Sequence, residues 1–183
     1  SRDVLLPRVI ADFRDESFAP DVMRQMGELG LLGPTIPEEY GGAGVNHVAY
    51  GLAAYEIEAV DSGYRSAMSV QSSLVMHPIN AFGTEEQKQE FITGGFDGSR
   101  RVAFGLTEPD HGSDATWMET KAVRETRDGV DGWRIDGEKM WITGMHVATH
   151  CAMFARTGGE NGDASGITCF LVPNPTPGLE IEE

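Results

Sequence analysis

The chain changes from a helical to a strand-like pattern at the stretch Phe104-Gly105-Leu106-Thr107-Glu108-Pro109-Asp110-His111-Gly112-Ser113-Asp114. An apolar, strand-like run ends there at Thr-Glu-Pro, and Gly-Ser-Asp then turns the chain back. Small residues and hydroxyl groups in such a turn leave backbone N–H groups able to point at an anion. The stretch therefore predicts a seat for a phosphate-bearing cofactor that does not depend on net positive charge.

The residues before position 100 follow a helical pattern, in which apolar residues recur every three to four positions. Thr84 and Gln87 form a capping-box pattern, which is typical of a helix start. The predicted helices cover residues 21–32, 47–60, 64–75 and 84–92. The stripes that we expect to be buried are Val22, Met26 and Leu29 in the first helix, and Val48, Leu52, Tyr55 and Ala59 in the second.

The residues after position 100 read as strands. The predicted strands cover residues 102–106, 121–125, 133–135, 140–142, 151–155 and 167–172. Asp-Gly turns at 128–129, 131–132 and 136–137 separate some of these runs, and Asp136-Gly137 between two short strands is a good signal for a hairpin. Several strands in succession, without helices between them, favour antiparallel pairing.

Helices followed by strands indicate an α+β chain rather than an alternating parallel sheet. We expect an all-helical N-terminal domain over residues 1–99 and an antiparallel, β-barrel-like middle domain over residues 100–183. The pattern at each end of the chain is unfinished, so we expect the middle domain to be truncated and the helical domain to lack its first helix.

The composition excludes several classes of partner. Acidic residues number 29 against 14 basic residues, a net charge of −15, which argues against binding to nucleic acid or to an anionic membrane surface. No apolar run approaches the ~20 residues of a membrane helix, so we expect no membrane insertion. The first residues lack the pattern of a signal peptide, and we expect a cytoplasmic location.

Cysteines, histidines and glycines give weaker signals. Cys151 and Cys169 lie in apolar runs and are expected to be reduced, buried thiols. His146 and His150 have helical metal-ligand spacing but lie at a strand approach, so surface or packing roles and no metal are expected. The glycine-rich residues 41–44 have no preceding strand and predict a tight loop rather than a nucleotide site.

Two constellations suggest ligand binding while leaving alternatives open. Arg65 and Ser69 lie one helical turn apart and could hold a carboxylate, but Arg65 could equally pair with Glu58 or Asp61 at the surface. The run 141–143, Trp-Ile-Thr, offers a flat apolar wall and a hydroxyl donor that suit a heteroaromatic ring. The pattern alone favours a core tryptophan at a strand end over this second role.

These residues together resemble the acyl-CoA dehydrogenase family. Four stretches in the family's order and spacing carry the resemblance, which covers nearly the whole chain. They are Gly30-Leu31-Leu32-Gly33 with Pro37-Glu38-Glu39-Tyr40-Gly41-Gly42, Gly83-Thr84-Glu85-Glu86-Gln87, Leu106-Thr107-Glu108-Pro109 with Gly112-Ser113-Asp114, and Asp136-Gly137-Glu138-Lys139 with Trp141-Ile142-Thr143.

Residues 61–73 resemble the glutaryl-CoA dehydrogenase branch of that family. The resemblance implies that Arg65, with Ser66 and Ser69, contacts the distal carboxylate of the substrate. Residues 92–96 and 115–117 depart from the common pattern, which leaves the exact acyl chain open.

FAD is the cofactor that the resemblance implies. Ser113 would lie near both the pyrophosphate and the CoA thioester arm, and Thr143 would donate toward flavin N5. The residues expected to contact FAD are Phe104, Gly105, Leu106, Thr107, Gly112, Ser113, Trp141, Ile142 and Thr143.

The implied reaction is α,β-dehydrogenation of an acyl-CoA, with oxidative decarboxylation of glutaryl-CoA to crotonyl-CoA in this branch. Electrons would pass from FAD to an electron-transfer flavoprotein, and the full-length enzyme would be a homo-oligomer, as a tetramer. The family's catalytic base is a Glu in a C-terminal helical bundle absent from this chain, so no catalytic residue is assigned and the chain alone is expected to be inactive. The alternatives are a short- or medium-chain acyl-CoA dehydrogenase without decarboxylation, or a non-catalytic flavin- or CoA-binding module.

Overall fold

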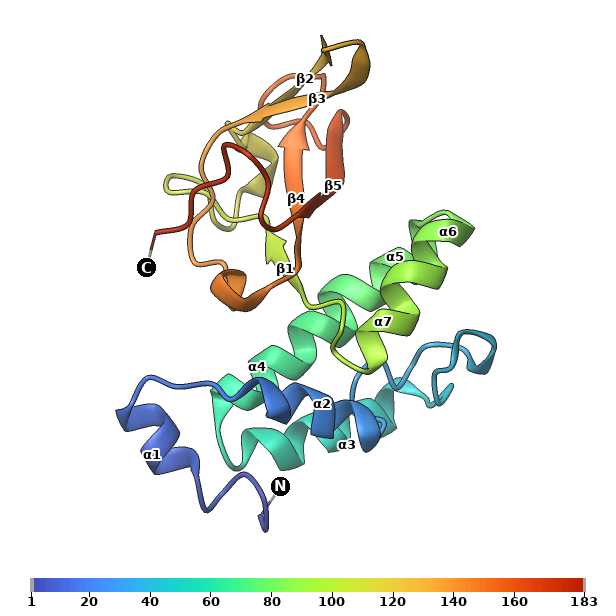
Figure 1. Ribbon diagram of the computed structural model, residues 1–183, viewed down its shortest axis with the longest axis vertical. Coiled ribbons are helices and arrows are strands. Elements are labelled where there is room, and N and C mark those ends of the chain that lie inside the picture. Colours follow the sequence, from blue (N-terminus) through green and yellow to red (C-terminus); the bar gives the residue numbers. More distant parts are fainter. Residues whose placement is uncertain (1, 183) are drawn as a thin grey trace. The chain divides into compact units, whose positions relative to one another are not determined.

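The computed structural model describes residues 2–182, apart from the side chain of residue 20. The chain divides into two compact units, Ser1–Arg101 and Val102–Glu183, and each is described here by itself. The first unit is helical and the second is built on a sheet, so the chain has the α+β composition that its sequence predicts (Figure 1).

The helices of the first unit follow one another closely in sequence. Ser62–Phe82 is one continuous helix made of α4, a π-helical stretch and α5, and a second continuous helix is made of α6, η3 and α7. The elements are α1 Val9–Arg14, α2 Pro20–Glu28, η1 Glu38–Tyr40, α3 His47–Glu58, α4 Ser62–Ser69, η2 Val70–Met76, α5 His77–Phe82, α6 Glu85–Gln87, η3 Lys88–Ile92 and α7 Thr93–Phe96.

Side-chain caps explain where three of these helices begin. The Asn46 side chain accepts a hydrogen bond from the N–H of Ala49 at 3.0 Å, and the Asp61 carboxylate accepts one from the N–H of Gly63 at 2.8 Å. Thr84 and Gln87 make both hydrogen bonds of the predicted capping box. Such caps satisfy N–H groups that have no partner inside the helix.

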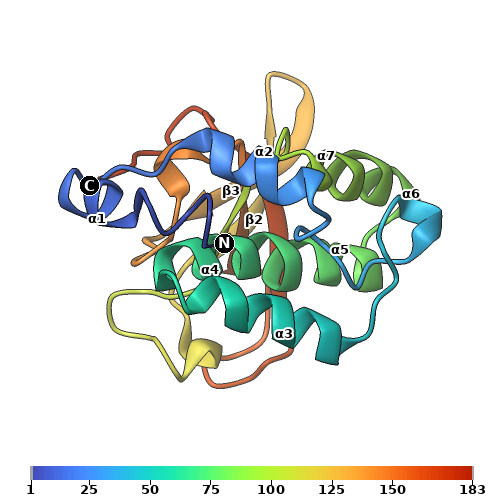
Figure 2. The same ribbon diagram turned by 90° about the horizontal axis from the view of Figure 1, so that it is seen from below.

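The core of the helical unit gathers around α4, which lies between α2 and α3 (Figure 2). It contains Leu5, Val22, Met23, Met26, Leu32, Ile57, Tyr64 and Met68. The predicted stripe on α2 is therefore right for Val22 and Met26, but Leu29 is exposed. The predicted stripe on α3 is wrong, because Val48, Leu52, Tyr55 and Ala59 are all exposed and Ile57 is the buried residue.

The second unit is a mixed sheet in which β4 is the central strand. The strands are β1 Val102–Gly105, β2 Lys121–Arg127, β3 Val130–Asp136, β4 His150–Arg156 and β5 Ile167–Pro173. β5 pairs antiparallel with β4, β1 pairs parallel with His150–Met153, and β2 pairs parallel with β4 only at Lys121 and Arg156. The described strands do not close into a barrel, so the predicted antiparallel barrel is not confirmed.

The hairpin turn lies at Asp128-Gly129, one of the three predicted Asp-Gly turns, and not at Asp136-Gly137. β2 and β3 are joined at Asp128-Gly129, whose φ angles of 53° and 78° are those of a left-handed hairpin turn. Gly137, in the predicted turn, instead leads the chain out of the sheet with φ 150°. The predicted strand over 140–142 is also absent, because Trp141 has φ 60° and cannot pair as a strand residue.

Candidate functional site

Two predicted segments of the site lie together beside the end of β1. Lys139 donates from Nζ to the carbonyl oxygen of Leu106 at 3.1 Å. The N–H of Met140 donates to the carbonyl oxygen of Thr107 at 2.9 Å. The segment that ends β1 and the segment that contains Trp141 are therefore joined through both backbone and side chain.

A buried ion pair reinforces this junction. Lys139 Nζ lies 2.7 Å from Glu108 Oε1, and the two side chains are only 6% and 4% exposed. The Glu108 carboxylate also accepts hydrogen bonds from the N–H groups of Glu119 at 2.6 Å and Thr120 at 3.0 Å. One carboxylate thus joins the loop after β1, the two residues that precede β2 and the segment after β3.

The electrostatics of this pair follow from its contacts. Burial by itself raises the pKa of Glu108, but the hydrogen bonds from Lys139, Thr120 and Glu119 outweigh it and lower that pKa to about 2. Burial also lowers the pKa of Lys139, and the hydrogen bond to Glu108 opposes that change. Glu108 is therefore a firmly ionised carboxylate inside the unit.

Trp141 projects from the unit rather than packing into its core. Its side chain is 84% exposed, and its φ of 60° is rare for a bulky residue. Ile142 is half-buried and Thr143 is exposed. The interpretation of Trp141 as a core tryptophan is therefore wrong, and the segment exposes an indole and a hydroxyl at the surface of the unit.

The remaining residues of the predicted cofactor set differ in exposure. Phe104 is half-buried against Phe154, with ring centroids 5.1 Å apart, and Leu106 and Thr107 are also half-buried. Gly105 is buried, and a Cβ placed there would lie 2.8 Å from Cys151 Sγ.

Gly112 and Ser113 lie in an exposed loop that begins with two reciprocal backbone hydrogen bonds between Glu108 and His111, of 3.0 and 3.3 Å. Within residues 2–182, no hydrogen bond joins Gly112 or Ser113 to the run 141–143.

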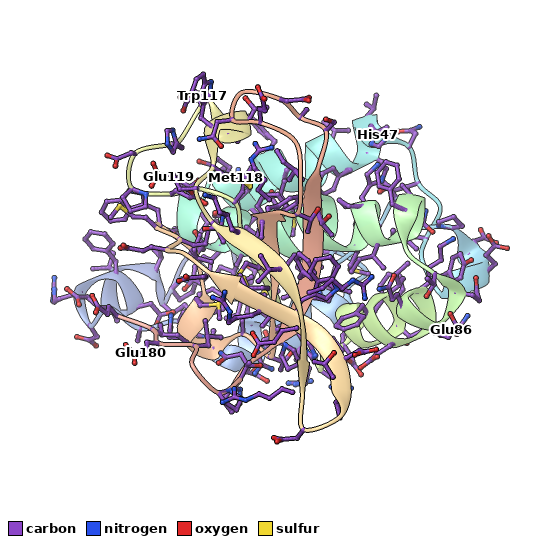
Figure 3. The ribbon with its side chains drawn as sticks, turned by 90° about the horizontal axis from the view of Figure 1, so that it is seen from above. His47, Glu86, Trp117, Met118, Glu119 and Glu180 are labelled. Carbon is purple, nitrogen blue, oxygen red and sulfur yellow. The ribbon has the colours of Figure 1, made fainter. Side chains whose placement is uncertain are left out.

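The loop after Ser113 is anchored beyond the short helix η4, Ala115–Trp117. Figure 3 shows Trp117 pointing outward at the edge of this loop, followed by Met118 and Glu119. Met118 is only 1% exposed, so it fixes the chain just before Glu119 donates its N–H to Glu108. Glu108 and Lys139 both lie in stretches that carry the family resemblance. Their ion pair joins residues 31 positions apart, so no local sequence pattern predicted it.

Arg65 lies on α4 in the helical unit, where it pairs with Glu58. Arg65 Nε lies 2.5 Å from Glu58 Oε2, and the side chains are 36% and 43% exposed. Ser66 and Ser69 are half-buried on the same helix. The structure thus shows the surface ion pair that was one of the two sequence interpretations, while the carboxylate-binding role of Arg65 stays a prediction.

The other candidates form no further site. Both cysteines are free, but Cys169 is exposed, so the expectation of two buried thiols holds only for Cys151. Burial raises the pKa of the Cys151 thiol to about 11. The described residues contain no group of three or more potential His, Cys, Asp or Glu metal ligands. No helix in the described part of the chain has the length and apolar character needed to span a membrane.

Comparison with known families accounts for both units. Residues 2–99 match the model of the acyl-CoA dehydrogenase N-terminal domain, and residues 103–183 match the model of the acyl-CoA dehydrogenase middle domain. The chain belongs to the acyl-CoA dehydrogenase family. Acyl-CoA dehydrogenases are oxidoreductases that use FAD.

Individual acyl-CoA dehydrogenases resemble the chain closely. The mitochondrial short-chain specific acyl-CoA dehydrogenase of Mus musculus is 40% identical over 168 residues, which are 92% of this chain and 40% of that protein.

A crystal structure of glutaryl-CoA dehydrogenase from Mycobacterium smegmatis is 45% identical with a TM-score of 0.85, over 97% of this chain and 43% of that one. A crystal structure of a glutaryl-CoA dehydrogenase from the same organism, in complex with FADH2, is 43% identical with a TM-score of 0.84, over 96% of this chain and 42% of that one. The chain spans about two fifths of the length of these relatives.

Proposed function

We propose that this chain supplies the flavin seat of an FAD-dependent acyl-CoA dehydrogenase. The observation that carries the proposal is the junction of the β1 end with the Trp141 segment, held by Glu108 and Lys139. This junction presents an exposed indole and an exposed threonine beside a glycine-containing strand end. A flat apolar wall with few polar donors suits a flavin ring.

The proposed flavin contacts divide into three groups. Backbone of 104–107 would face the pyrimidine side of the ring, while the run 141–143 would supply the wall and a donor toward N5. Gly112 and Ser113 would lie toward the pyrophosphate, where an exposed loop without a side chain at Gly112 lets an anion approach backbone N–H groups.

The proposed reaction is α,β-dehydrogenation of an acyl-CoA thioester. FAD, when bound, supplies the acceptor for the hydrogen that leaves the β-carbon as hydride. A carboxylate must take the α-proton, and we place that base outside this chain, in a C-terminal helical bundle. The contribution of this chain is to orient the ring and to exclude water from one of its faces.

Glutaryl-CoA is the substrate that we favour, with decarboxylation to crotonyl-CoA after dehydrogenation. Support comes from residues 61–73 and from the 45% identity to the glutaryl-CoA dehydrogenase of Mycobacterium smegmatis. Arg65 would bind the distal carboxylate, aided by Ser66 and Ser69. For that role the guanidinium must leave Glu58 or share its donors between the two carboxylates.

A short-chain acyl-CoA is the second candidate substrate. It is supported by the 40% identity to the mouse short-chain specific enzyme and by the pairing of Arg65 with Glu58, which occupies the guanidinium. In either case we propose that an electron-transfer flavoprotein accepts the electrons from FAD. We also propose that the full-length enzyme is a homotetramer.

Anaerobic reduction of the bound flavin tests these proposals. The intact protein, loaded with FAD, is titrated with glutaryl-CoA and with butyryl-CoA while the flavin absorbance is recorded. Bleaching by either substrate supports a dehydrogenase, and the more effective substrate identifies the branch. A protein that binds FAD but is bleached by no acyl-CoA would instead be a non-catalytic flavin- or CoA-binding module.

A further inference from the structure

The buried Glu108–Lys139 pair has a more specific arrangement than stability alone requires. Buried ion pairs often add little net stability, because removing two charges from water offsets their attraction. Here, however, the carboxylate, which lies in the loop after β1, accepts three donors from two other segments: Lys139 Nζ from one, and the N–H groups of Glu119 and Thr120 from the other. A single group of this kind fixes the relative positions of all three segments.

Lys139 extends this network to the backbone that ends β1. Its Nζ contacts both Glu108 Oε1 and the Leu106 carbonyl oxygen, at 2.7 and 3.1 Å. The N–H of Met140 then bonds to the carbonyl oxygen of Thr107. Two successive residues are therefore anchored to two successive carbonyl groups, which sets the direction in which the chain leaves toward Trp141.

Trp141 follows directly in a left-handed conformation that bulky residues adopt only where their surroundings enforce it. Its own side chain is 84% exposed, so packing of the indole does not provide that enforcement within this unit. The anchored residues Lys139 and Met140 precede it, and Gly144, also left-handed at φ 73°, follows it.

We propose that Glu108 and Lys139 are positioning residues for FAD. They are too deeply buried to touch the cofactor themselves, and they act by fixing to the strand end at 104–107 the backbone that carries Trp141 and Thr143. The proposal rests on the proposed flavin site and adds two residues to it. It predicts that the pair controls the affinity and the geometry of bound flavin beyond any effect on folding.

The experiment uses the intact protein with FAD as the probe. Variants Lys139→Met, Lys139→Arg and the double variant Glu108→Gln/Lys139→Met are compared with wild type. The double variant leaves no unpaired charge. Its single Gln oxygen keeps one of the two N–H partners, because Glu119 donates to Oε2 and Thr120 to Oε1 of Glu108, and the Tm of the apoprotein reports what the loss of the other costs. Arg134→Met is the matched control, because Arg134 pairs with Glu125 on the surface of the same unit at 3.1 Å.

Three quantities are measured: the dissociation constant of FAD, the visible circular dichroism of the bound flavin and the Tm of the apoprotein. We expect Lys139→Met and the double variant to weaken FAD binding by about tenfold or more. Mutation of residues that orient the ligands of a metal, without touching the metal, has an effect of similar size on metal affinity. Their flavin dichroism should also change, whereas Lys139→Arg should keep most of the affinity and Arg134→Met all of it.

Wild-type affinity and dichroism in a folded double variant would overturn the positioning role, even if Tm falls. Arg134→Met would also overturn the role if it weakened FAD binding as much as Lys139→Met does. Removal of any positive charge from the unit would then be enough to weaken FAD binding. If wild-type protein itself binds no FAD, the proposed function fails rather than the role of the pair.

Discussion

Gly137 lies directly against Thr120, so that a Cβ at position 137 would come within 2.6 Å of the Thr120 Cα. Thr120 is 1% exposed and donates its N–H to Glu108. The backbone at residue 137 also has φ 150°, which L-residues rarely adopt. A glycine is therefore required where the chain leaves β3 for the Trp141 segment.

Gly137→Ala should destabilise the sheet unit by about 2 kcal/mol or more, because backbone atoms on both sides must shift. Urea unfolding of the intact protein measures the change in the free energy of unfolding. Gly132→Ala on β3 is the matched control, since a Cβ there meets nothing within 4 Å. Equal stability of the two variants would show that the close approach of Thr120 does not constrain residue 137.

Trp141→Gly should separate flavin binding from stability. The left-handed conformation suits glycine, and the indole is 84% exposed, so the Tm of the apoprotein should stay the same or rise. FAD affinity should fall, because the ring loses its wall, by roughly 1–2 kcal/mol. Fluorescence titration with FAD measures that loss, and undiminished binding would remove Trp141 from the proposed contacts.

Arg65→Ala tests the proposed carboxylate role in the helical unit. Loss of one charge-assisted partner should reduce transition-state stabilisation for glutaryl-CoA by about 2–3 kcal/mol, measured as a fall in kcat/KM. Turnover of butyryl-CoA should stay nearly unchanged. Arg24→Ala serves as control, because Arg24 makes comparable exposed ion pairs with Asp21 and Glu28.

Glu58→Gln adds a second arm, since it frees the guanidinium from its partner. It should preserve or improve binding of glutaryl-CoA. If Arg65→Ala and Glu58→Gln instead reduce turnover of both substrates alike, the ion pair is structural and the substrate is not a dicarboxylyl-CoA.

Glu108 should also make stability depend on pH. Its pKa is lowered from 4.5 to about 2 in the folded protein, so its stabilising contribution is complete above pH ~4.5 and is lost as pH falls toward 2. The full contribution is on the order of 3 kcal/mol. Unfolding between pH 7 and 3.5 should therefore show a shallower pH dependence for Glu108→Gln than for wild type, and identical slopes would contradict the depressed pKa.

Local features of the fold were predictable from sequence, whereas pairings between distant residues were not. The capping box at Thr84 and Gln87 depends on residues three positions apart, and it forms as predicted. The parallel pairing of β1 with β4 joins segments almost fifty positions apart, through Val102 and His150, and no local pattern specifies it. The apolar run at 140–142 has strand composition, but its tertiary anchors impose a left-handed turn.

The candidate site likewise has parts that the sequence motifs predicted and parts that depend on contacts between distant residues. The segments that we propose to hold the cofactor carry family motifs in the sequence, because glycines, hydroxyls and Trp141 lie at characteristic spacings. The partnership of Glu108 with Lys139 was not recognisable, since each looks like an ordinary surface charge until burial is known. Arg65 was ambiguous in sequence, because its neighbours along the chain include both an ion-pair partner, Glu58 at the end of α3, and potential ligand donors on α4.

The β2–β3 hairpin turn at Asp128-Gly129 has a practical consequence. Residues 123–131 are all exposed, and the turn closes with the pair Arg127 and Val130, far along the strands from the Lys121–Arg156 contact with β4. Exposed turns of this kind are where chains tolerate insertions. A fluorophore or short affinity sequence placed between Asp128 and Gly129 would give a handle for immobilising the protein and following flavin exchange in real time.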